Sequence, residues 1–224
     1  MNIFPEIVGH ITDWDIIVVG HLKVNTFFGE TYDNPPRGDP STCTSVMVRG
    51  VTSDSRPYVL IIDPTLRVKP EDYYFDVNRR TGLRERDVTH CFCTHHHGDH
   101  YEALRYFPGA AWYAETGVAG MIAGGGCAFD ISRITGVAGE FLPGVRAVPL
   151  PGHTGNLHGV AFLHHGKRIL VAGDAVMSKY HLDAEVTDFQ IDPQMKAKAA
   201  ETIRNIKESF DIVVPGHDNM VITG

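Results

Sequence analysis

The sequence lacks the features that mark several large classes of protein. No run of apolar residues approaches the roughly 18 that a membrane-spanning helix needs. The first ten residues, MNIFPEIVGH, have Pro5 and Glu6 where a secretory signal would need a basic segment followed by an apolar one. The formal net charge of -7 argues against a protein that follows nucleic-acid phosphates. We therefore expect a cytoplasmic protein that makes no membrane contact and does not favour nucleic acid as a partner.

Cysteine is also scarce. The four cysteines (Cys43, Cys91, Cys93 and Cys127) lack the spacing of a zinc knuckle, a redox motif or a disulfide framework. Cys91 and Cys93 alternate along an expected strand, so their side chains share one face of it. Because free cysteine is among the most buried residue types, we expect these two in the core rather than at a metal.

Histidine, by contrast, is abundant, with 13 in a chain of 224 residues. The nine-residue segment CTHHHGDHY contains four of them and lies at the end of an expected strand. Side chains two apart on an extended segment point the same way, so His95 and His97 can reach one metal ion. Gly98 permits a sharp turn, after which Asp99 and His100 can reach a second point nearby. Nitrogen and oxygen ligands of this kind suit a borderline cation such as Zn²⁺.

Three further candidate ligands follow expected strands, and each lies beside a glycine. They are His153 in PGHTG, Asp174 in AGDA and His217 in PGHD. Loops at one edge of a layered scaffold are where binding sites are commonly assembled. The sequence therefore predicts that distant strands deliver these side chains to one site.

The order of the expected elements indicates the fold class. Strands are expected at 15–19, 44–49, 58–63, 88–94, 111–114, 145–150, 158–164, 168–172 and 212–214, and helices at 70–80, 101–107, 115–123 and 193–210. Asp192 is the expected N-cap of the last helix. Two runs of strands, each closed by a helix, favour two mixed sheets packed face to face with helices outside. We predict an α/β fold, a four-layer αββα sandwich, with residues 1–224 in a single domain.

The order of the candidate ligands resembles the signature of the metallo-β-lactamase superfamily. That signature is His-x-His-x-Asp-His, followed by a later His, Asp and His, each after a strand. The matching positions are His95, His97, Asp99, His100, His153, Asp174 and His217. These motifs span residues 95–217, and the expected strands extend the resemblance to nearly the whole chain. The resemblance implies the metallo-β-lactamase fold and a catalytic metal site.

The resemblance further implies that the site holds two divalent metal ions. His95, His97 and His153 would bind the first ion, Asp99, His100 and His217 the second, and Asp174 would bridge them. Zinc is the first expectation, and iron and manganese are alternatives. Two such ions can share a hydroxide that attacks an electrophilic carbonyl or phosphorus. Asp99 is the expected catalytic residue, because its carboxylate can orient this hydroxide and carry a proton to the leaving group.

The sequence differs from several well-known branches of the superfamily, and these differences reduce the number of expected activities. Seven residues follow His217, too few for the C-terminal domain of glyoxalase II. Asp174 stands where one common class of β-lactamases has cysteine, and Met177 where acyl-homoserine lactonases have tyrosine. The compact length and the stretches FPGA and VVPGHDNMVITG are similar to the group around metallo-β-lactamase domain-containing protein 1.

We therefore predict a dinuclear metal hydrolase that uses a metal-bridging hydroxide on a small lactone, ester or thioester. A metal-dependent phosphodiesterase or ribonuclease, and a mononuclear iron enzyme like the persulfide dioxygenases, are the alternatives. The expected binding partner is the small-molecule substrate. The sequence leaves open whether the protein forms a homodimer.

Other residues near the expected site have two interpretations each. Asp63 either braces the metal loop or forms a simple Asp-Pro turn with Pro64. His96 is expected to be structural or exposed. The segments 21–28, 28–42 and 177–189 are expected pocket walls, in which Phe27, Phe28, Tyr180 and His181 either shape the substrate site or serve packing.

Overall fold

The computed structural model describes residues 10–25, 28–31, 33, 40–125, 129–186 and 193–223. Phe27, Cys127, Phe189 and Asp192 lie outside these residues, as do residues 32 and 34–39 of the expected loop at 28–42.

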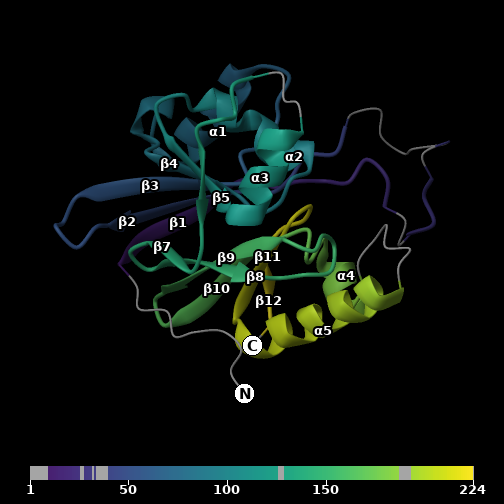
Figure 1. Ribbon diagram of the computed structural model, residues 1–224. Coiled ribbons are helices and arrows are strands. Elements are labelled where there is room, and N and C mark those ends of the chain that lie inside the picture. The colour runs from purple at the N-terminus through teal and green to yellow at the C-terminus, as the bar shows by residue number, and fades with distance from the viewer. Residues whose placement is uncertain are drawn as a thin grey trace.

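The described chain forms two six-stranded sheets (Figure 1). The first contains, in spatial order, β1 (Ile11–Val18), β2 (Ser45–Val51), β3 (Pro57–Ile62), β4 (His90–Cys93), β5 (Ala111–Glu115) and β6 (Ile134–Val137). The second contains β12 (Val221–Ile222), β11 (Ile212–Pro215), β10 (Lys167–Gly173), β9 (His158–His164), β8 (Val145–Pro149) and β7 (Glu140–Leu142). In the first sheet β1 to β3 are antiparallel and β3 to β6 parallel. In the second, β10 and β11 are parallel and the other pairs antiparallel, so both sheets are mixed as predicted.

Helices cover the outer face of each sheet (Figure 1). α1 (Pro70–Thr81), α2 (Gly98–Tyr101) and α3 (Thr116–Gly124) lie on the first sheet, with short 3₁₀ turns at Glu85–Asp87 and Glu102–Tyr106. α4 (Lys179–Ala184) and α5 (Pro193–Ser209) lie on the second. None of the described helices has the length and apolar character that crossing a membrane requires.

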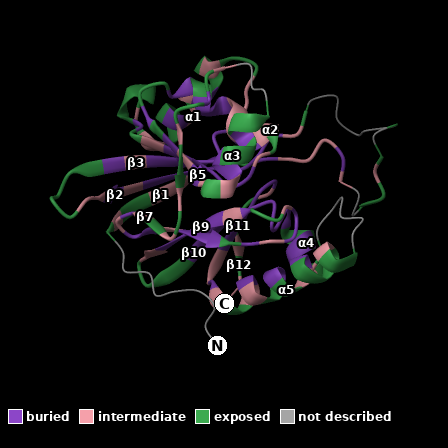
Figure 2. Ribbon diagram, in the orientation of Figure 1, coloured by how far each residue is buried: buried purple, intermediate pink, exposed green. Residues whose placement is uncertain are grey.

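Alternation along the strands produces three apolar layers. The central parts of the strands are buried (Figure 2). In β2, Val46 and Val48 pack between the two sheets, whereas Met47 packs on the helix side. In β10, Ile169 packs between the sheets and Leu170 against the outer helices. Strands buried on both faces must be apolar at every position, which explains their continuous hydrophobic runs. The result is the predicted αββα sandwich.

Cys91 and Cys93 are fully buried in the helix-side layer of the first sheet, as predicted. The helix expected at 101–107 is wrong in its start, because α2 begins at Gly98 and a 3₁₀ turn follows from Glu102. His100 donates its backbone N–H to the carbonyl of His97 at 3.0 Å, so helical geometry begins directly after the extended residues. Asp99 therefore lies in a helical turn rather than in a chain reversal.

Four elements were not predicted from the sequence, namely β6, β7, β12 and α4. The sequence of β6, ITGV, has two exposed central residues and a glycine, so it carries no strand pattern. The other three elements contain between two and six residues, which is too short for a periodicity to show.

Candidate metal centre

The seven candidate ligands lie after the carboxyl ends of four strands, one in the first sheet and three in the second. His95 and His97 follow β4, and Asp99 and His100 begin α2. The other three follow β8, β10 and β11. The starts of α2 and α4 mark the edge of the sandwich where these loops meet (Figure 1).

The structure brings the first set of donors together. His95, His97, His153 and Asp174 offer atoms that all lie within 4.8 Å of one another. Nδ1 of His97 is 3.0 Å from Nε2 of His95 and 3.0 Å from Nε2 of His153. Oδ2 of Asp174 lies 3.7 Å from Nε2 of His95 and 3.5 Å from Nε2 of His153. We call these three histidines the first group.

Asp99, His100 and His217 form the second group, again with donor atoms within 4.8 Å of one another. Oδ2 of Asp99 is 3.9 Å from Nε2 of His100 and 3.7 Å from Nε2 of His217. Each of these two Nε2 atoms lies 3.2 Å from Oδ1 of Asp174.

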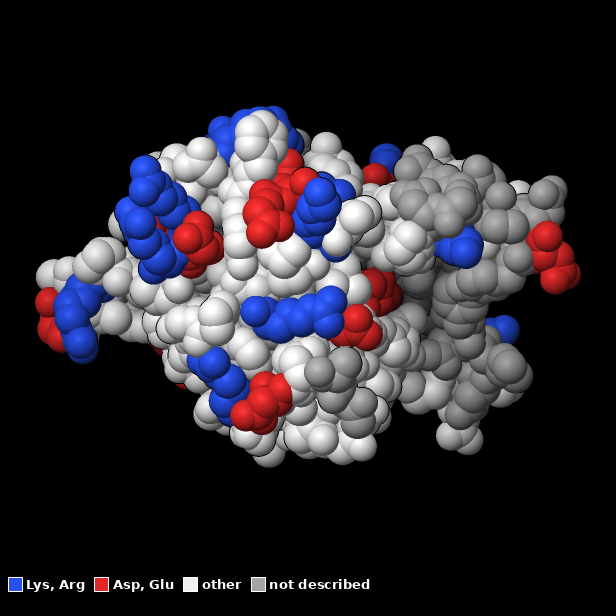
Figure 3. All heavy atoms as spheres, turned by 90° about the horizontal axis from the view of Figure 1, so that it is seen from above, with Lys and Arg blue, Asp and Glu red and all other residues white. Residues whose placement is uncertain are grey.

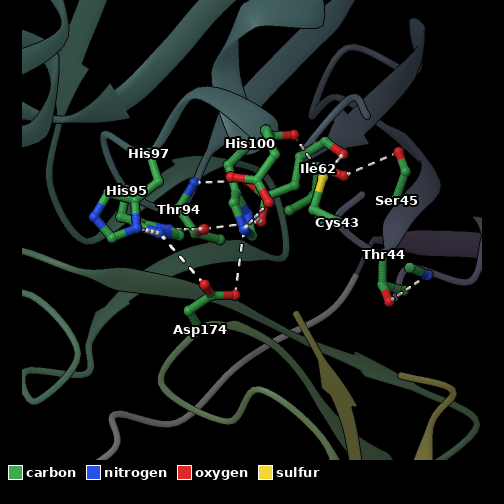
Figure 4. A network of polar contacts seen from close by, with 12 residues as sticks. Cys43, Thr44, Ser45, Ile62, Thr94, His95, His97, His100 and Asp174 are labelled. Carbon is green, nitrogen blue, oxygen red and sulfur yellow. Dashed lines mark hydrogen bonds and ion pairs between the residues drawn. The ribbon is translucent and has the colours of Figure 1, made fainter. Parts of the chain in front are cut away.

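Asp174 thus lies between the two groups: Oδ1 faces the second, and Oδ2 faces the first and also lies 3.3 Å from Nε2 of His217. Figure 4 shows its carboxylate below the histidine cluster, with dashed lines from its oxygens to ring nitrogens. Tight packing keeps the carboxylate in place, because Gly216 leaves no room for a Cβ: a side chain there would lie 2.1 Å from Oδ1.

The donor set fits divalent cations. Nε2 of His100 and Oδ1 of Asp174 are buried and lie 3.2 Å apart without forming a hydrogen bond, an arrangement that is costly unless a further group meets them. Imidazole nitrogens with a carboxylate are ligands that zinc, iron and manganese accept. His96, although it lies between His95 and His97, belongs to neither group.

Comparison with known proteins identifies the family. The family model of the metallo-beta-lactamase superfamily matches residues 38–217. The chain belongs to the metallo-beta-lactamase superfamily. It is accordingly a metal-dependent hydrolase, and its fold implies divalent metal ions.

Solved structures share the superfamily fold at low sequence identity. A Thermotoga maritima protein assigned as a metallo-beta-lactamase has 19% identity and a TM-score of 0.66, covering 96% of this chain and 100% of its own. AiiA of B. thuringiensis, with N-decanoyl-L-homoserine bound at its active site, has 14% identity and a TM-score of 0.67, covering 94% of each chain. A Staphylococcus aureus protein assigned as a metal-dependent hydrolase has 15% identity and a TM-score of 0.66, covering 97% of this chain and 94% of its own. None of the curated proteins matches the chain in sequence.

Asp63 holds residues of the site in place through buried hydrogen bonds. Its carboxylate is fully buried and accepts hydrogen bonds from the backbone N–H and the hydroxyl of Thr94, each at 2.8 Å. It also accepts one from Nδ1 of His100 at 2.9 Å. These are the contacts of the bracing interpretation and not of a simple Asp-Pro turn. Because the hydroxyl of Thr94 donates to Asp63, its oxygen can accept the Nδ1 proton of His95, 3.1 Å away.

These acceptors direct the ring nitrogens toward the centre. With its proton on Nδ1, His95 carries a lone pair on Nε2, and the Nδ1 contact of His100 with Asp63 directs its Nε2 toward Asp174, where a bound cation would take the place of a proton. His217 is oriented similarly, because its Nδ1 donates to the carbonyl oxygen of Thr42 at 3.0 Å. Sequence reasoning did not identify Thr42 or Thr94, since a hydroxyl or carbonyl that acts through a neighbour carries no pattern of its own.

The electrostatics of the two groups differ. Burial lowers the pKa of His95 and His153, and lowers that of His97 to about 4, so these imidazoles are neutral near pH 7. Burial also acts against the charged form of His100, but neighbouring carboxylates, above all Asp174, raise its pKa well above the usual range. The second group therefore favours positive charge near Asp174, a condition that a divalent cation satisfies.

A cleft of about 470 Å³ opens onto both groups. It is lined by Leu22, Pro40, Ser41, His97, Asp99, His153, Asp174, Met177 and His217. An adjoining pocket of about 350 Å³ shares Leu22 and His217 with the cleft and contains Phe28 and Tyr180, whose rings meet edge to face at 4.8 Å. Of the expected wall residues, His181 is fully buried and lines neither.

Proposed function

We propose that this superfamily member is a dinuclear hydrolase that cleaves a small lactone, ester or thioester. One observation carries the proposal: two groups of donors meet at the single carboxylate of Asp174, and one cleft reaches both groups. In the proposal the first group and the second group each hold one ion, and Asp174 is shared. Each ion would have three ligands of its own and a share in Asp174, and the cleft that reaches both groups would leave an open side for water and substrate, as a catalytic site requires.

The chain's own residues would bind, orient and transfer protons. Bound divalent ions supply Lewis acidity and lower the pKa of a water between them. Asp99, the catalytic residue of the proposal, has a partly exposed carboxylate that lines the cleft. It can hold the attacking water by one oxygen and receive its proton. The same oxygen can then deliver that proton to the leaving alkoxide or thiolate, so the proton balance closes.

The lining of the cleft favours an uncharged carboxylic derivative as the substrate over a polyanion such as a nucleic acid. Leu22, Pro40 and Met177 give it apolar walls, and the described residues that line it include no lysine or arginine. On the face shown in Figure 3, basic side chains alternate with acidic ones and form no continuous track. A phosphodiester chain would therefore find little of the positive surface that usually dominates nucleic-acid affinity.

The test begins with the metal content of chain purified without added metal. About two ions of zinc, iron or manganese per chain support the proposal. A single iron that is retained when Asp99 and His217 are replaced would favour the persulfide-dioxygenase-like alternative. Turnover of bis-para-nitrophenyl phosphate in preference to a panel of lactones and thioesters would favour the phosphodiesterase alternative.

Asp99→Ala should nearly abolish turnover while the fold, followed by circular dichroism, remains intact. His96→Ala is the matched control, since His96 lies in the same loop and belongs to neither group. Full activity of Asp99→Ala would refute the proposed mechanism.

A further inference from the structure

The segment that leads into β2, Thr42 to Thr44, lies directly behind the second group. It is buried, and Cys43 and Thr44 are almost completely so. Its polar atoms contact residues far away in the sequence.

Cys43 connects the end of β3 with the start of α2. Its Sγ lies 3.0 Å from the carbonyl oxygen of Asp99 and 3.3 Å from that of Asp63. One S–H can donate to either oxygen or be shared by both. Figure 4 shows the sulfur between Ser45, Ile62 and the His100 region. The thiol therefore fixes the backbone of Asp99 directly, and that of Asp63, whose carboxylate holds His100.

The residues on either side of Cys43 hold the third member of the group. The carbonyl oxygen of Thr42 accepts the Nδ1 proton of His217. Thr44 donates its N–H to the carbonyl of Gly216 at 2.6 Å and its hydroxyl to the carbonyl of Asp218 at 2.8 Å. Hydrogen bonds from Thr44 therefore hold the backbone on both sides of His217, at Gly216 and at Asp218.

We propose that Thr42 to Thr44 is a positioning element for the second group and that Cys43 is its positioning residue. The inference rests on the proposed function, in which the second group holds an ion. Three consecutive residues reach Asp99 and His217 directly and His100 through Asp63. The first group is linked to this segment less directly, because His95 is held by the hydroxyl of Thr94, which in turn donates to Asp63. Loss of the thiol should accordingly weaken one metal position more than the other.

Cys43→Ala removes the donor, and Cys43→Ser restores one on a shorter side chain. Cys91→Ala is the matched control: this thiol is equally buried in the same sheet, and its side chain packs in the helix-side core. Each chain is stripped of metal and titrated with cobalt(II) alone, followed by calorimetry and by the visible spectrum of the bound ion. In parallel, the ring N–H signals of His100 and His217 are recorded by NMR in the metal-free chains.

For Cys43→Ala we expect one ion bound as in the parent chain and the other at least about tenfold more weakly, the range typical of lost partners behind a ligand. Cys43→Ser should recover most of this affinity, and Cys91→Ala should bind both ions as the parent does. The slowly exchanging ring N–H signals should be lost or shifted in Cys43→Ala and retained in Cys91→Ala.

Unchanged binding of both ions by Cys43→Ala would overturn the inference, as would an equal loss of both ions without recovery in Cys43→Ser. If the parent chain binds one ion, the dinuclear function fails. The NMR comparison then decides the inference by itself, because it uses no metal: unchanged ring signals overturn it, and their loss in Cys43→Ala alone supports it.

Discussion

Gly216→Ala is the sharpest test of how Asp174 is held. An added Cβ would lie 2.1 Å from Oδ1 of Asp174 and 2.9 Å from the carbonyl carbon of Gly173. Real Cβ atoms essentially never approach other atoms closer than 3.0 Å, so the carboxylate or the backbone must move by about 0.9 Å. The backbone cannot yield easily, because the N–H of Gly216 donates to the carbonyl of Val176 at 2.9 Å.

The displacement should reach both groups, since the carboxylate of Asp174 contacts His95 and His153 of the first and His100 and His217 of the second. A shift of about 1 Å in a reacting constellation can reduce turnover by about 10²-fold. Overpacking of this kind should also lower the free energy of unfolding by about 1–3 kcal/mol. We expect Gly216→Ala to remain folded at 25 °C, to bind less metal per chain and to lose about two orders of magnitude in kcat.

The assay combines metal analysis of the purified variant, urea unfolding and hydrolysis of whichever ester or lactone the parent chain accepts. Gly155→Ala is the control, because Gly155 lies in the loop of His153 and an added Cβ there meets nothing within 4 Å. Full metal content and parental kcat in Gly216→Ala would refute the packing argument.

Three further predictions follow from single contacts. Thr94→Val removes the hydroxyl between Asp63 and His95 and should weaken metal binding about 10–100-fold in a chelator competition, whereas Thr94→Ser should not. Burial raises the pKa of Cys43 and Cys91, so both thiols stay protonated between pH 7 and 9; with Cys93 also buried, Ellman's reagent should titrate at most one of the four cysteines in the folded chain and all four in urea. Gly120→Ala, at an exposed position inside α3 where a Cβ meets nothing, should raise the free energy of unfolding by about 0.5–1 kcal/mol, measured by urea denaturation.

Much of the fold could be predicted because its strands carry a strong pattern. β3 and the buried part of β10 from Ile169 onward are apolar runs that end in a turn, and α5 buries Ala199, Ile203 and Ile206 at helical spacing. β6 and β12 could not be predicted, because an edge strand of two to four residues gains its stability from its neighbour rather than from its own sequence. That residues 1–224 form a single domain stays a prediction.

The candidate ligands were recognisable because each is a histidine or aspartate directly after a strand. The residues behind them were not. Cys43 has the composition of an ordinary core residue, and the carbonyl of Thr42 has no side-chain signature at all. Asp63 was ambiguous because an Asp-Pro pair also forms common turns. Tertiary contacts alone distinguish these roles, since each depends on a partner 31 to 175 positions away.

The position of Asp174 has a consequence for how the molecule is assembled. Its loop belongs to the second sheet, whereas His95, His97 and His100 belong to the first, so a bound ion fastens one half of the sandwich to the other. The unfolded chain offers no such constellation, and ligand binding is therefore linked to the folding equilibrium. With free metal at 100 times its dissociation constant, one such ion would add about 2.7 kcal/mol to the stability of the folded state. The metal centre would then link the two sheets without a covalent bond. Removal of the metal by a chelator would weaken the packing between the sheets before it affects the pairing of strands within either sheet.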